Sequence, residues 1–478
     1  MNTGKGTERM NINLLHRILS PETVVTDSAT LAGFTVDGIV PEALVYPEDL
    51  NQVAEVIRLA NSHNWGVIPW GGGTKMALGK PPVRFNLVLS TSRLNKILDL
   101  DVDNLTVTAQ AGVKLADLQD LVAGAENRCF FLPDDNLKKQ ADYMCSGGNY
   151  KGVFLPWDPP FADRVTLGGI VADNSTGPKR LRFGLPRDLI LGVKYVTPTG
   201  EIISMGGKTV KNVSGYDVSK IMIGSMGTLG IIGEITFRLL PLPEKVATVL
   251  AGFGTAASAR AFADRVLGSK LLPTSVEILN RPGYDLTRSR SLSLPPGGWC
   301  VAVAVQGFEE EVVREIADLT DMAQRDNALE SAKLGQEETL TFWRMVANCG
   351  AAPEGKTTIK FKGSFLISHY AEVMEAWSAT SSDYQPALTI SAGLGLAHGY
   401  IFGLPDEDPG KLAAVGSAFR TAAEKHEGSM IVESAPAPLK QKLDPWGSPG
   451  EDFILMKRIK ANVDPIGVLN PGRFLGGI

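Results

Sequence analysis

A stretch near the start of the chain decides the fold: Gly66-Val67-Ile68-Pro69-Trp70-Gly71-Gly72-Gly73-Thr74. Its first five residues are typical of a short buried strand, and three glycines follow directly. Consecutive glycines permit positive φ and let backbone N–H groups converge on an anion. The stretch therefore predicts a phosphate-binding loop. It is not a Walker A loop, because Pro81 follows Gly79-Lys80, and it lacks the G-x-G-x-x-G spacing of a dinucleotide-binding turn.

Two more glycine clusters follow within residues 71–230. One is Thr166-Leu167-Gly168-Gly169, and the other is Gly224-Ser225-Met226-Gly227-Thr228-Leu229-Gly230. An elongated cofactor lying along the backbone would account for all three, because glycine lets the main chain approach a pyrophosphate closely. Tight turns in a compact sheet fold are the alternative, and the spacing alone leaves both open.

The regions around these clusters alternate between helix and strand patterns. Pro47 is expected to open a helix with an apolar stripe to residue 60, and strands are expected at 87–90 and 105–110. The same patterns predict a helix at 115–122, two strands within 190–203 around a Pro198-Thr199-Gly200 turn, and a closing strand at 229–239. This alternation indicates an α/β layer fold that ends near Pro241 and Pro243.

The pattern changes after residue 245 to strand-then-helix units. Strands at 246–252 and 299–306 each precede a helix, at 256–267 and 309–324. A second, α+β domain is the economical interpretation, ending near Leu443, with a helix at 453–460 and a turn-rich tail after it. No internal repeat is visible in the sequence.

Composition limits the partners and the compartment. The chain has 478 residues, a net charge of -5 and a pI of about 5.7, with Lys and Arg spread along it, so no nucleic-acid footprint is expected. The cysteines, Cys129, Cys145, Cys300 and Cys349, form no C-x-x-C pair, which argues for reduced thiols and against zinc or iron–sulfur sites. No stretch is apolar enough to span a membrane. We expect a cytoplasmic protein, reaching the inner membrane only peripherally, through partners.

The motifs together resemble the FAD-linked oxidases of the vanillyl-alcohol oxidase / 4-cresol methylhydroxylase superfamily. Within it, the chain is similar to the FAD-binding, E-type subunits of bacterial glycolate oxidase. The resemblance rests on the following runs: residues 70–74, Leu155-Pro156-Trp157-Asp158-Pro159-Pro160, residues 166–169, residues 206–217, residues 227–230, Glu433-Ser434-Ala435-Pro436 and residues 464–474.

The resemblance implies an α+β fold in three parts. These are a two-part α/β FAD-binding domain at residues 1–243, a ferredoxin-like α+β cap domain at 244–443, and a C-terminal segment at 444–478 that returns to the FAD domain. Relatives that attach FAD covalently often carry His where this chain has Thr74 or Lys75, so non-covalent FAD is expected. Carried over onto matching positions, the residues expected to line FAD are Gly71, Gly72, Gly73, Thr74, Pro156, Thr166, Gly168, Gly169, Asn174, Gly184, Asp188, Gly230 and Ile232, with Asn470 and Arg473 near the flavin or the domain junction.

The motifs that hold a divalent metal in the D-type relatives are incomplete here. In those relatives a G-H-x-G-D-G-N-x-H strand and a G-E-H-G turn together suit a divalent metal and a base beside the substrate. This chain keeps His398 and Glu433, while Ser434 stands where the last histidine would be. No metal site is expected. His398 is then a hydrogen-bonded pocket histidine, an acid/base, or an incomplete metal ligand.

Removing hydride from a 2-hydroxy acid requires a base for the hydroxyl proton and a cation for the carboxylate. His398 and Glu433 are the candidate bases. Arg344 is the leading candidate cation beside Lys360 and Lys362, although all three cations could equally belong to a solvated face. His398, Glu433 and Arg344 are thus the predicted catalytic residues.

The resemblance suggests a subunit of a 2-hydroxy-acid (glycolate- or lactate-type) dehydrogenase complex. The flavin would accept hydride and pass electrons to an iron–sulfur subunit, with a second FAD subunit alongside. Two alternatives stay open: an electron-transfer subunit that binds no substrate, and a self-sufficient flavin dehydrogenase of another small acid or alcohol. Residues 133–152, from Pro133 to Gly152, look like an insertion, which is either an inert loop or a protein-docking loop.

Overall fold

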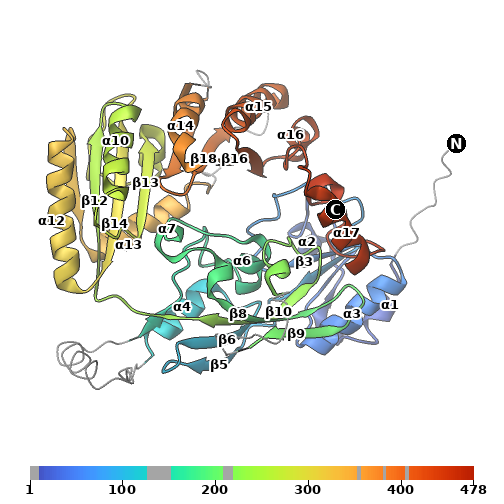
Figure 1. The fold of residues 1–478 in the computed structure, drawn as a ribbon. Helices are drawn as coiled ribbons and strands as arrows, with labels where there is room; N and C mark the ends of the chain where they lie inside the picture. Colours follow the sequence, from blue (N-terminus) through green and yellow to red (C-terminus); the bar gives the residue numbers. More distant parts are fainter. Residues whose placement is uncertain (1–9, 126–151, 208–218, 352–356, 380–383, 404–407) are drawn as a thin grey trace.

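The computed structural model describes residues 10–125, 152–207, 219–351, 357–379, 384–403 and 408–478. Cys129, Cys145, most of the 133–152 insertion and most of the 206–217 motif lie outside them. The chain forms two layered halves, with the N-terminal half in blue and green below a large sheet in yellow and orange (Figure 1). Both are built from sheets covered by helices.

The first sheet carries the glycine-rich stretch. Its strands are β1 (Val24–Val25), β2 (Ala43–Val45), β3 (Val67–Trp70) and β4 (Leu87–Ser90), in the order β1-β2-β4-β3, with β2 and β3 parallel to β4. Helix α3 (Leu50–Ser62) connects β2 to β3 and buries the expected apolar stripe. It begins at Leu50 rather than Pro47, because the Asp49 carboxylate accepts the N–H of Gln52 and caps the first turn.

The second sheet is antiparallel and completes the N-terminal half. It contains β5 (Ile97–Asp101), β6 (Thr106–Gln110), β8 (Ile190–Val196), β9 (Ile202–Gly206) and β10 (Ile231–Arg238), in the order β5-β6-β10-β8-β9. The expected last strand of this half, β10, therefore lies at the sheet's centre. Helices α4 (Leu115–Ala123) and α6 (Leu167–Asp173) contribute to the core over this sheet. The shorter elements are α1 (Ile12–Leu15), α2 (Ser28–Ala32), β7 (Val153–Phe154), α7 (Arg180–Phe183), α8 (Pro186–Leu189), α9 (Ser219–Met222) and β11 (Leu240–Pro241).

The C-terminal half is one eight-stranded antiparallel sheet. Its elements are β12 (Lys245–Phe253), α10 (Ala256–Leu267), β13 (Ser275–Asn280), α11 (Arg281–Leu286), β14 (Trp299–Gly307), α12 (Glu309–Arg325), β15 (Glu330–Leu334), α13 (Gln336–Ala347), β16 (Thr357–Ser364), α14 (Tyr370–Ala379), β17 (Ala387–Ser391), β18 (Leu396–Gly403), α15 (Pro409–Lys425) and β19 (Ser429–Ser434). The strand order is β15-β12-β14-β13-β17-β18-β16-β19. The expected ferredoxin-like cap thus contains two βαββαβ units of the same topology, joined where β13 pairs with β17.

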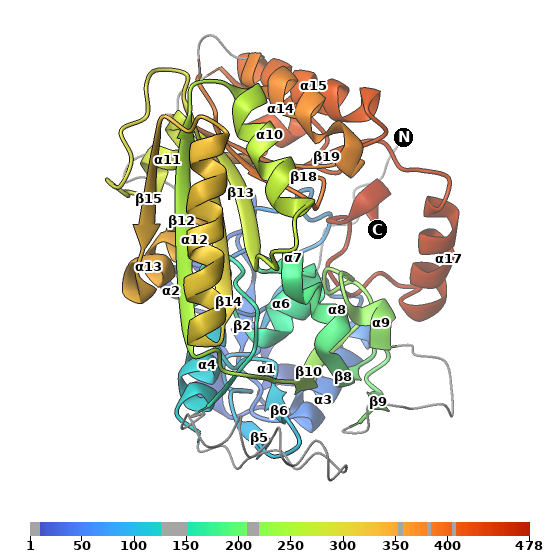
Figure 2. The same cartoon turned by 60° about the vertical axis from the view of Figure 1, so that its left-hand side comes forward.

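This doubling is invisible in the sequence because it is a repeat of topology, with different side chains at matching positions. Helices α10, α12, α14 and α15 pack on one face of the sheet and form its larger core. Figure 2 shows α10 and α12 in front of the sheet. A smaller core on the other face contains residues of α11 and α13.

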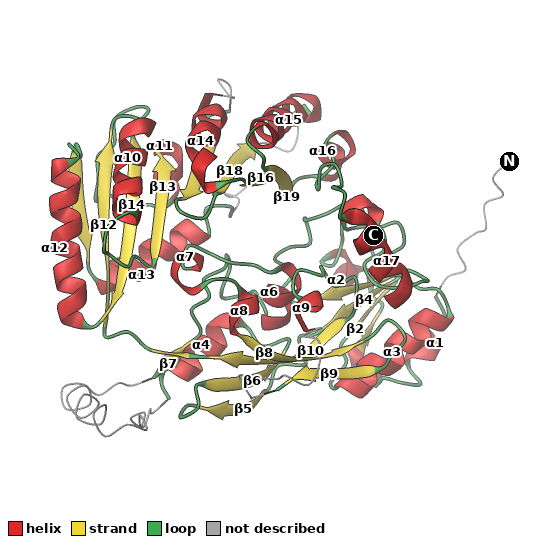
Figure 3. Ribbon diagram, in the orientation of Figure 1, coloured by secondary structure: helices red, strands yellow, loops and turns green. Residues whose placement is uncertain are grey.

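The end of the chain returns to the first sheet. After α16 (Ala437–Lys442) and α17 (Phe453–Val463), the Val67 N–H donates to the Val468 carbonyl at 2.8 Å, and the Asn470 N–H donates to the Val67 carbonyl at 2.9 Å. Figure 3 shows α17 beside the N-terminal half, away from the helices of the large sheet. The return places residues 470–474 next to the glycine-rich loop.

Candidate functional site

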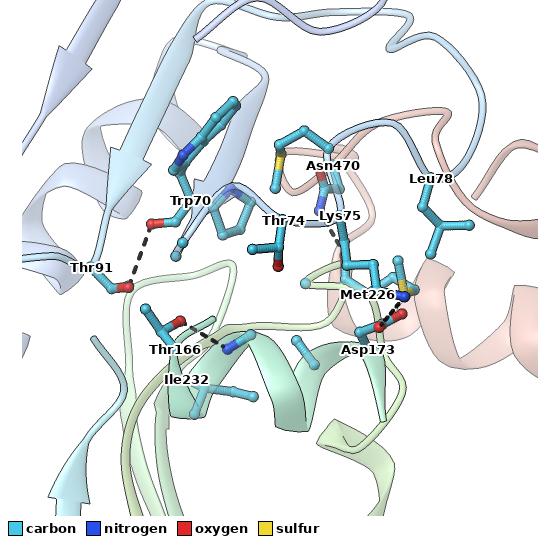
Figure 4. Close-up of a pocket in the computed structure, with 18 of the residues that line it drawn as sticks. Trp70, Thr74, Lys75, Leu78, Thr91, Thr166, Asp173, Met226, Ile232 and Asn470 are labelled. Atoms are coloured by element: carbon cyan, nitrogen blue, oxygen red, sulfur yellow. Dashed lines mark hydrogen bonds and ion pairs between the residues drawn. The ribbon is translucent and has the colours of Figure 1, made fainter. Parts of the chain in front are cut away.

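The glycine-rich loop, residues 71–78, forms one wall of a cavity that we call the glycine cavity. Its other walls come from the start of α6, from residues 226–232 and from the C-terminal return. Figure 4 shows Thr74 and Lys75 of the loop facing Thr166 and Ile232 across it. Of the residues predicted to line FAD, the following line this cavity: Gly71, Gly72, Gly73, Thr74, Thr166, Gly168, Gly169, Gly230, Ile232, Asn470 and Arg473.

Glycine is needed in the loop because it packs closely against residues 164–166. A Cβ at Gly71 would overlap the Thr166 hydroxyl, and one at Gly72 would overlap the Arg164 carbonyl oxygen. Gly73 has a φ of +69°, a conformation that other residues rarely adopt. Among the described residues, the backbone N–H groups of residues 71–74 have no protein acceptor. These donors fit a phosphate, and the cavity therefore fits the pyrophosphate of FAD.

Arg473 holds the far end of this loop in place. Its Nη2 donates to the carbonyls of Met76 and Leu78 at 2.7 and 2.8 Å, and Asn470 donates to the Met226 carbonyl at 2.6 Å. Burial lowers the pKa of Arg473 to about 10, so the guanidinium stays charged at neutral pH. The two residues predicted near the flavin thus tie the C-terminal return to both sides of the cavity.

Four residues predicted to line FAD do not line the glycine cavity. Gly184, at a φ of +74°, and Asp188, which accepts the Leu185 N–H at 2.7 Å, shape the turn before α8. Asn174 ends α6 in the left-handed conformation, and Pro156 is buried before that helix. Their FAD contacts stay predictions, as do those of the residues that line the glycine cavity.

A cluster of three lysines surrounds Glu433 beside the glycine cavity. Glu433 lies 2.7 Å from the Lys360 ammonium, 3.5 Å from Lys75 and 3.8 Å from Lys362, and its side chain is only 6% exposed. Lys75 also contacts Asp173 at 3.3 Å. The lysine cluster therefore joins the glycine-rich loop to the large sheet. Lys75 was missed as a catalytic candidate because nothing in the sequence brings the loop near β19.

The register of the large sheet explains how these side chains meet. Phe361 lies opposite Val432 but Lys360 lies opposite Ser434, so Glu433 is the extra residue of a β-bulge. A bulge redirects its side chain away from the regular alternation. Lys362 lies opposite His398 in the pair of β16 with β18, which places Lys360, Lys362 and His398 on one face of the sheet.

The charges of this cluster set the protonation states. Burial would raise the pKa of Glu433, but Lys360, Lys75 and Lys362 together hold it well below its usual range, so the carboxylate stays ionised. Burial, reinforced by Lys360, holds the pKa of His398 well below 6.5. His398 is consequently a neutral imidazole at physiological pH, with a ring nitrogen able to accept a proton.

These residues line a second cavity, which we call the lysine cavity. His398, Glu433, Tyr400 and the lysine cluster contribute to it, together with Glu277 on β13. Glu277 is 3% exposed and accepts a hydrogen bond from the Ser391 hydroxyl at 2.5 Å. Burial raises its pKa to about 8. The lysine cavity meets the glycine cavity at Lys75, Asp173 and Ser175, which line both.

Arg344, the predicted carboxylate ligand, lies elsewhere. It is exposed on α13 and lines a different cavity between the two halves, whereas Lys360 and Lys362 line the lysine cavity. The sequence could not distinguish Arg344 from Lys360 and Lys362. All three side chains are positively charged, and the charge does not show whether a residue lies on an exposed helix or on a strand that faces a cavity.

The lysine cavity does not suit a divalent metal. The part of the chain described by the structure contains no cluster of three or more His, Cys, Asp or Glu side chains. Glu433 is already paired with ammonium groups, which would repel a cation. Cys300 and Cys349 are both buried free thiols.

Comparisons with known proteins identify the family. A family described as FAD binding domain matches residues 41–134 and 148–206, and one described as FAD linked oxidases, C-terminal domain, matches residues 242–474. The chain belongs to the FAD-linked oxidases, the superfamily that its motifs indicate. A solved structure of p-cresol methylhydroxylase has the same fold, with a TM-score of 0.69 at 16% identity, covering 97% of this chain and 95% of that one.

Relatives with an assigned activity match most of the chain. Glycolate oxidase subunit GlcD of Bacillus subtilis is 27% identical over 91% of this chain and 88% of its own. D-2-hydroxyglutarate dehydrogenase of Stutzerimonas stutzeri is 25% identical over 98% of this chain and 99% of its own. The expected likeness to a glycolate oxidase subunit is confirmed, but that relative is named as a D subunit, so the E-type character stays a prediction.

No helix among the described residues combines the length and apolar character needed to cross a bilayer.

Proposed function

We propose that this protein is an FAD-dependent dehydrogenase of a small 2-hydroxy acid. The observation that carries the proposal is that His398 and three lysines line one cavity, which shares Lys75, Asp173 and Ser175 with the glycine cavity. Bound non-covalently in the glycine cavity, FAD would supply the hydride acceptor. The chain's own residues would bind the acid, orient it and take its proton.

The lysine cluster supports binding of a carboxylate. Three lysines face two carboxylates, Glu433 and Asp173, which leaves one positive charge in the cavity. Charge-assisted hydrogen bonds in a site with little exposure to water are stronger than those in solvent. The lysines would thus hold the acid by its carboxylate. The hydroxyl of the acid would be directed toward β18, the strand that pairs with β16.

His398 is the best candidate for the base. It lies opposite Lys362 on the neighbouring strand, and as a neutral imidazole that lines the lysine cavity it has a lone pair for the hydroxyl proton. Glu433 is a weaker candidate, because its carboxylate is already paired with the ammonium groups of the lysine cluster. We infer that Glu433 positions the lysines and that His398 accepts the hydroxyl proton.

Electron transfer onward is part of the same proposal. A relative whose printed name calls it a subunit supports a complex. We propose that in this complex electrons leave the flavin for an iron–sulfur subunit, with a second FAD subunit present. The alternative, a relay subunit without a substrate, is less well supported because the lysine cavity already combines an anion site with a base.

Anaerobic flavin reduction tests this function. Purified protein is mixed without oxygen with glycolate, each lactate enantiomer or each 2-hydroxyglutarate enantiomer, and the flavin absorbance is followed. At least one acid should bleach the flavin within seconds, and His398→Gln should slow that step about 10²- to 10⁴-fold while retaining FAD. A flavin that stays oxidised with every acid would favour the relay alternative, and protein unable to bind flavin would refute the proposal entirely.

A further inference from the structure

A third cavity, between the two halves, has no role in the chemistry described so far. We call it the interdomain cavity. It has a volume of about 200 Å³, against about 50 Å³ for the lysine cavity. Gln119, Asp158 and Lys179 line it from the N-terminal half, and Trp343 and Arg344 line it from α13.

The wall between the interdomain cavity and the lysine cavity is thin. Ala347, the last residue of α13, lines both, and the adjacent Pro159 and Pro160 line one each. The Asn348 side chain accepts the Phe161 N–H at 2.7 Å and so fixes the end of α13 against this segment. The three cavities thus form a series in which the lysine cavity lies between the other two.

This order shows on which side of the lysine cavity the interdomain cavity lies. The lysine cavity shares Lys75, Asp173 and Ser175 with the glycine cavity, so a flavin bound in the glycine cavity would lie on that side. Ala347 lines the lysine cavity and does not line the glycine cavity. The side chain of Ala347 is a methyl group, the smallest side chain after that of glycine. Glycine would leave this wall still more open, but it would also make the end of α13 more flexible.

The charges of the interdomain cavity favour an anion. Arg344 is exposed at its wall, and Lys179 is half-buried within it. The single carboxylate, Asp158, accepts the Lys179 backbone N–H at 3.0 Å. Lys179 and Arg344 against Asp158 leave one net positive charge along the path toward the lysine cluster, and a net positive potential raises the local concentration of anions.

We propose that the interdomain cavity is the substrate entrance, that Ala347 limits the size of acid admitted, and that Arg344 attracts the anion from solvent. The proposal rests on the proposed function for its choice of substrate class. It assigns Arg344 to the approach of the acid, whereas its sequence pattern had suggested contact with the bound carboxylate.

Stopped-flow measurements on the FAD-loaded protein test this entrance. Two probes are used: the best reducible hydroxy acid, followed by flavin bleaching, and oxalate, an unreactive anion followed by perturbation of the flavin spectrum. Ala347→Phe should slow the second-order association of both probes about tenfold or more, and slow larger acids more than glycolate. Ala347→Val should give a smaller effect in the same direction. The matched control is Ala379→Phe, at the exposed last residue of α14.

Arg344→Gln separates steering from direct binding. If Arg344 steers, the association rate falls about three- to tenfold at low salt, its salt dependence weakens, and the rate at saturating acid does not change. Arg314→Gln, an exposed arginine on α12, should behave as wild type. A salt-independent loss of affinity would instead make Arg344 a carboxylate ligand and contradict the proposal.

The two probes distinguish failure of the entrance from failure of the function. Acids that never reduce wild-type flavin, combined with oxalate binding that Ala347→Phe slows, would refute the function and support the entrance. Association rates in Ala347→Phe equal to wild type would overturn the entrance alone. Oxalate that fails to bind wild-type protein would overturn it as well, because the cavity would then admit no anion.

Discussion

Lys360 makes the shortest contact to the carboxylate at the centre of the lysine cavity, 2.7 Å from Glu433. Lys360→Met removes one cation and leaves Glu433 with two. We expect the Kd of oxalate and of a substrate acid to rise about 10- to 100-fold, since a hydrogen bond to a charged group contributes about 1.5–3 kcal/mol. FAD content should not change, because Lys360 does not line the glycine cavity.

The matched control for Lys360→Met is Lys333→Met, an exposed lysine on β15 of the same sheet. It should leave both dissociation constants at the wild-type value. An unchanged oxalate Kd in Lys360→Met, measured by titration of the flavin spectrum, would show that the lysine cluster is structural.

Glu277 makes the stability of the fold depend on pH. Burial raises its pKa from 4.5 to about 8. Between these values the folded protein holds a proton that the unfolded chain has released, so stability is highest at the acid end of the window and falls as pH rises toward 8. Glu277→Gln cannot ionise and should lose less stability between pH 5 and pH 8, by on the order of a few kcal/mol.

Urea unfolding at pH 5 and pH 8 measures this difference. Wild type and Glu310→Gln, an exposed position on α12, should show the same pH dependence. If the Glu277→Gln curve ran parallel to wild type, Glu277 would be ionised in the fold and the burial argument would be wrong.

At the scale of elements, the β3-to-loop connection depends on glycines that make room for the neighbouring backbone. A methyl group at Gly72 would overlap the Arg164 carbonyl, so Gly72→Ala must displace the loop from residues 164–166. Overpacking of this kind costs about 1–3 kcal/mol, and the displaced N–H groups should bind FAD more weakly. Gly207→Ala, at a glycine with open space around it, should change neither stability nor FAD affinity. Flavin fluorescence during dilution measures the Kd, and equal values for both variants would refute this account.

Local elements were the part of the fold that sequence patterns could predict. The stripe of α3, β4, the two strands around the Pro198 turn and the paired strand–helix units of the large sheet all occur close to where they were expected. The start of α3 was wrong because Asp49 caps the helix after Pro47. The doubled ferredoxin-like unit could not be predicted, since strand order depends on contacts between segments over a hundred residues apart.

The site residues likewise fall into those that local sequence patterns could predict and those that they could not. Residues 71–74 and 166–169 are recognisable in the sequence by their many glycines, and in the structure they line one cavity. Lys75 and Glu277 gave no such signal: each acts through neighbours from other segments, Glu433 in one case and Ser391 in the other. The catalytic role of Arg344 stays a prediction, and the structure places this residue at a different cavity from Lys360 and Lys362.

At the scale of the whole molecule, Lys460 on α17 joins the end of the chain to the N-terminal half. It is buried and donates to the Asp464 carboxylate at 2.6 Å and to the carbonyls of Thr228 and Leu469 at 2.8 and 3.1 Å. Asp464 in turn accepts the N–H groups of Val468 and Leu469. Lys460 therefore fixes both the loop before β10 and the segment that carries Asn470 and Arg473.

Lys460→Met leaves Asp464 buried without its cation, which costs about 3–5 kcal/mol. The loss should spread to cofactor binding, because Arg473 and Asn470 hold the glycine-rich loop and residue 226. We expect lower urea stability and purification with less FAD, whereas Lys457→Met, an exposed lysine on the same helix, should keep both. Excess FAD should restore part of the lost stability, because a ligand that binds only the folded state shifts the equilibrium toward it. A Lys460→Met protein that was destabilised but retained full FAD affinity would show that the C-terminal return supports the fold without shaping the cofactor site.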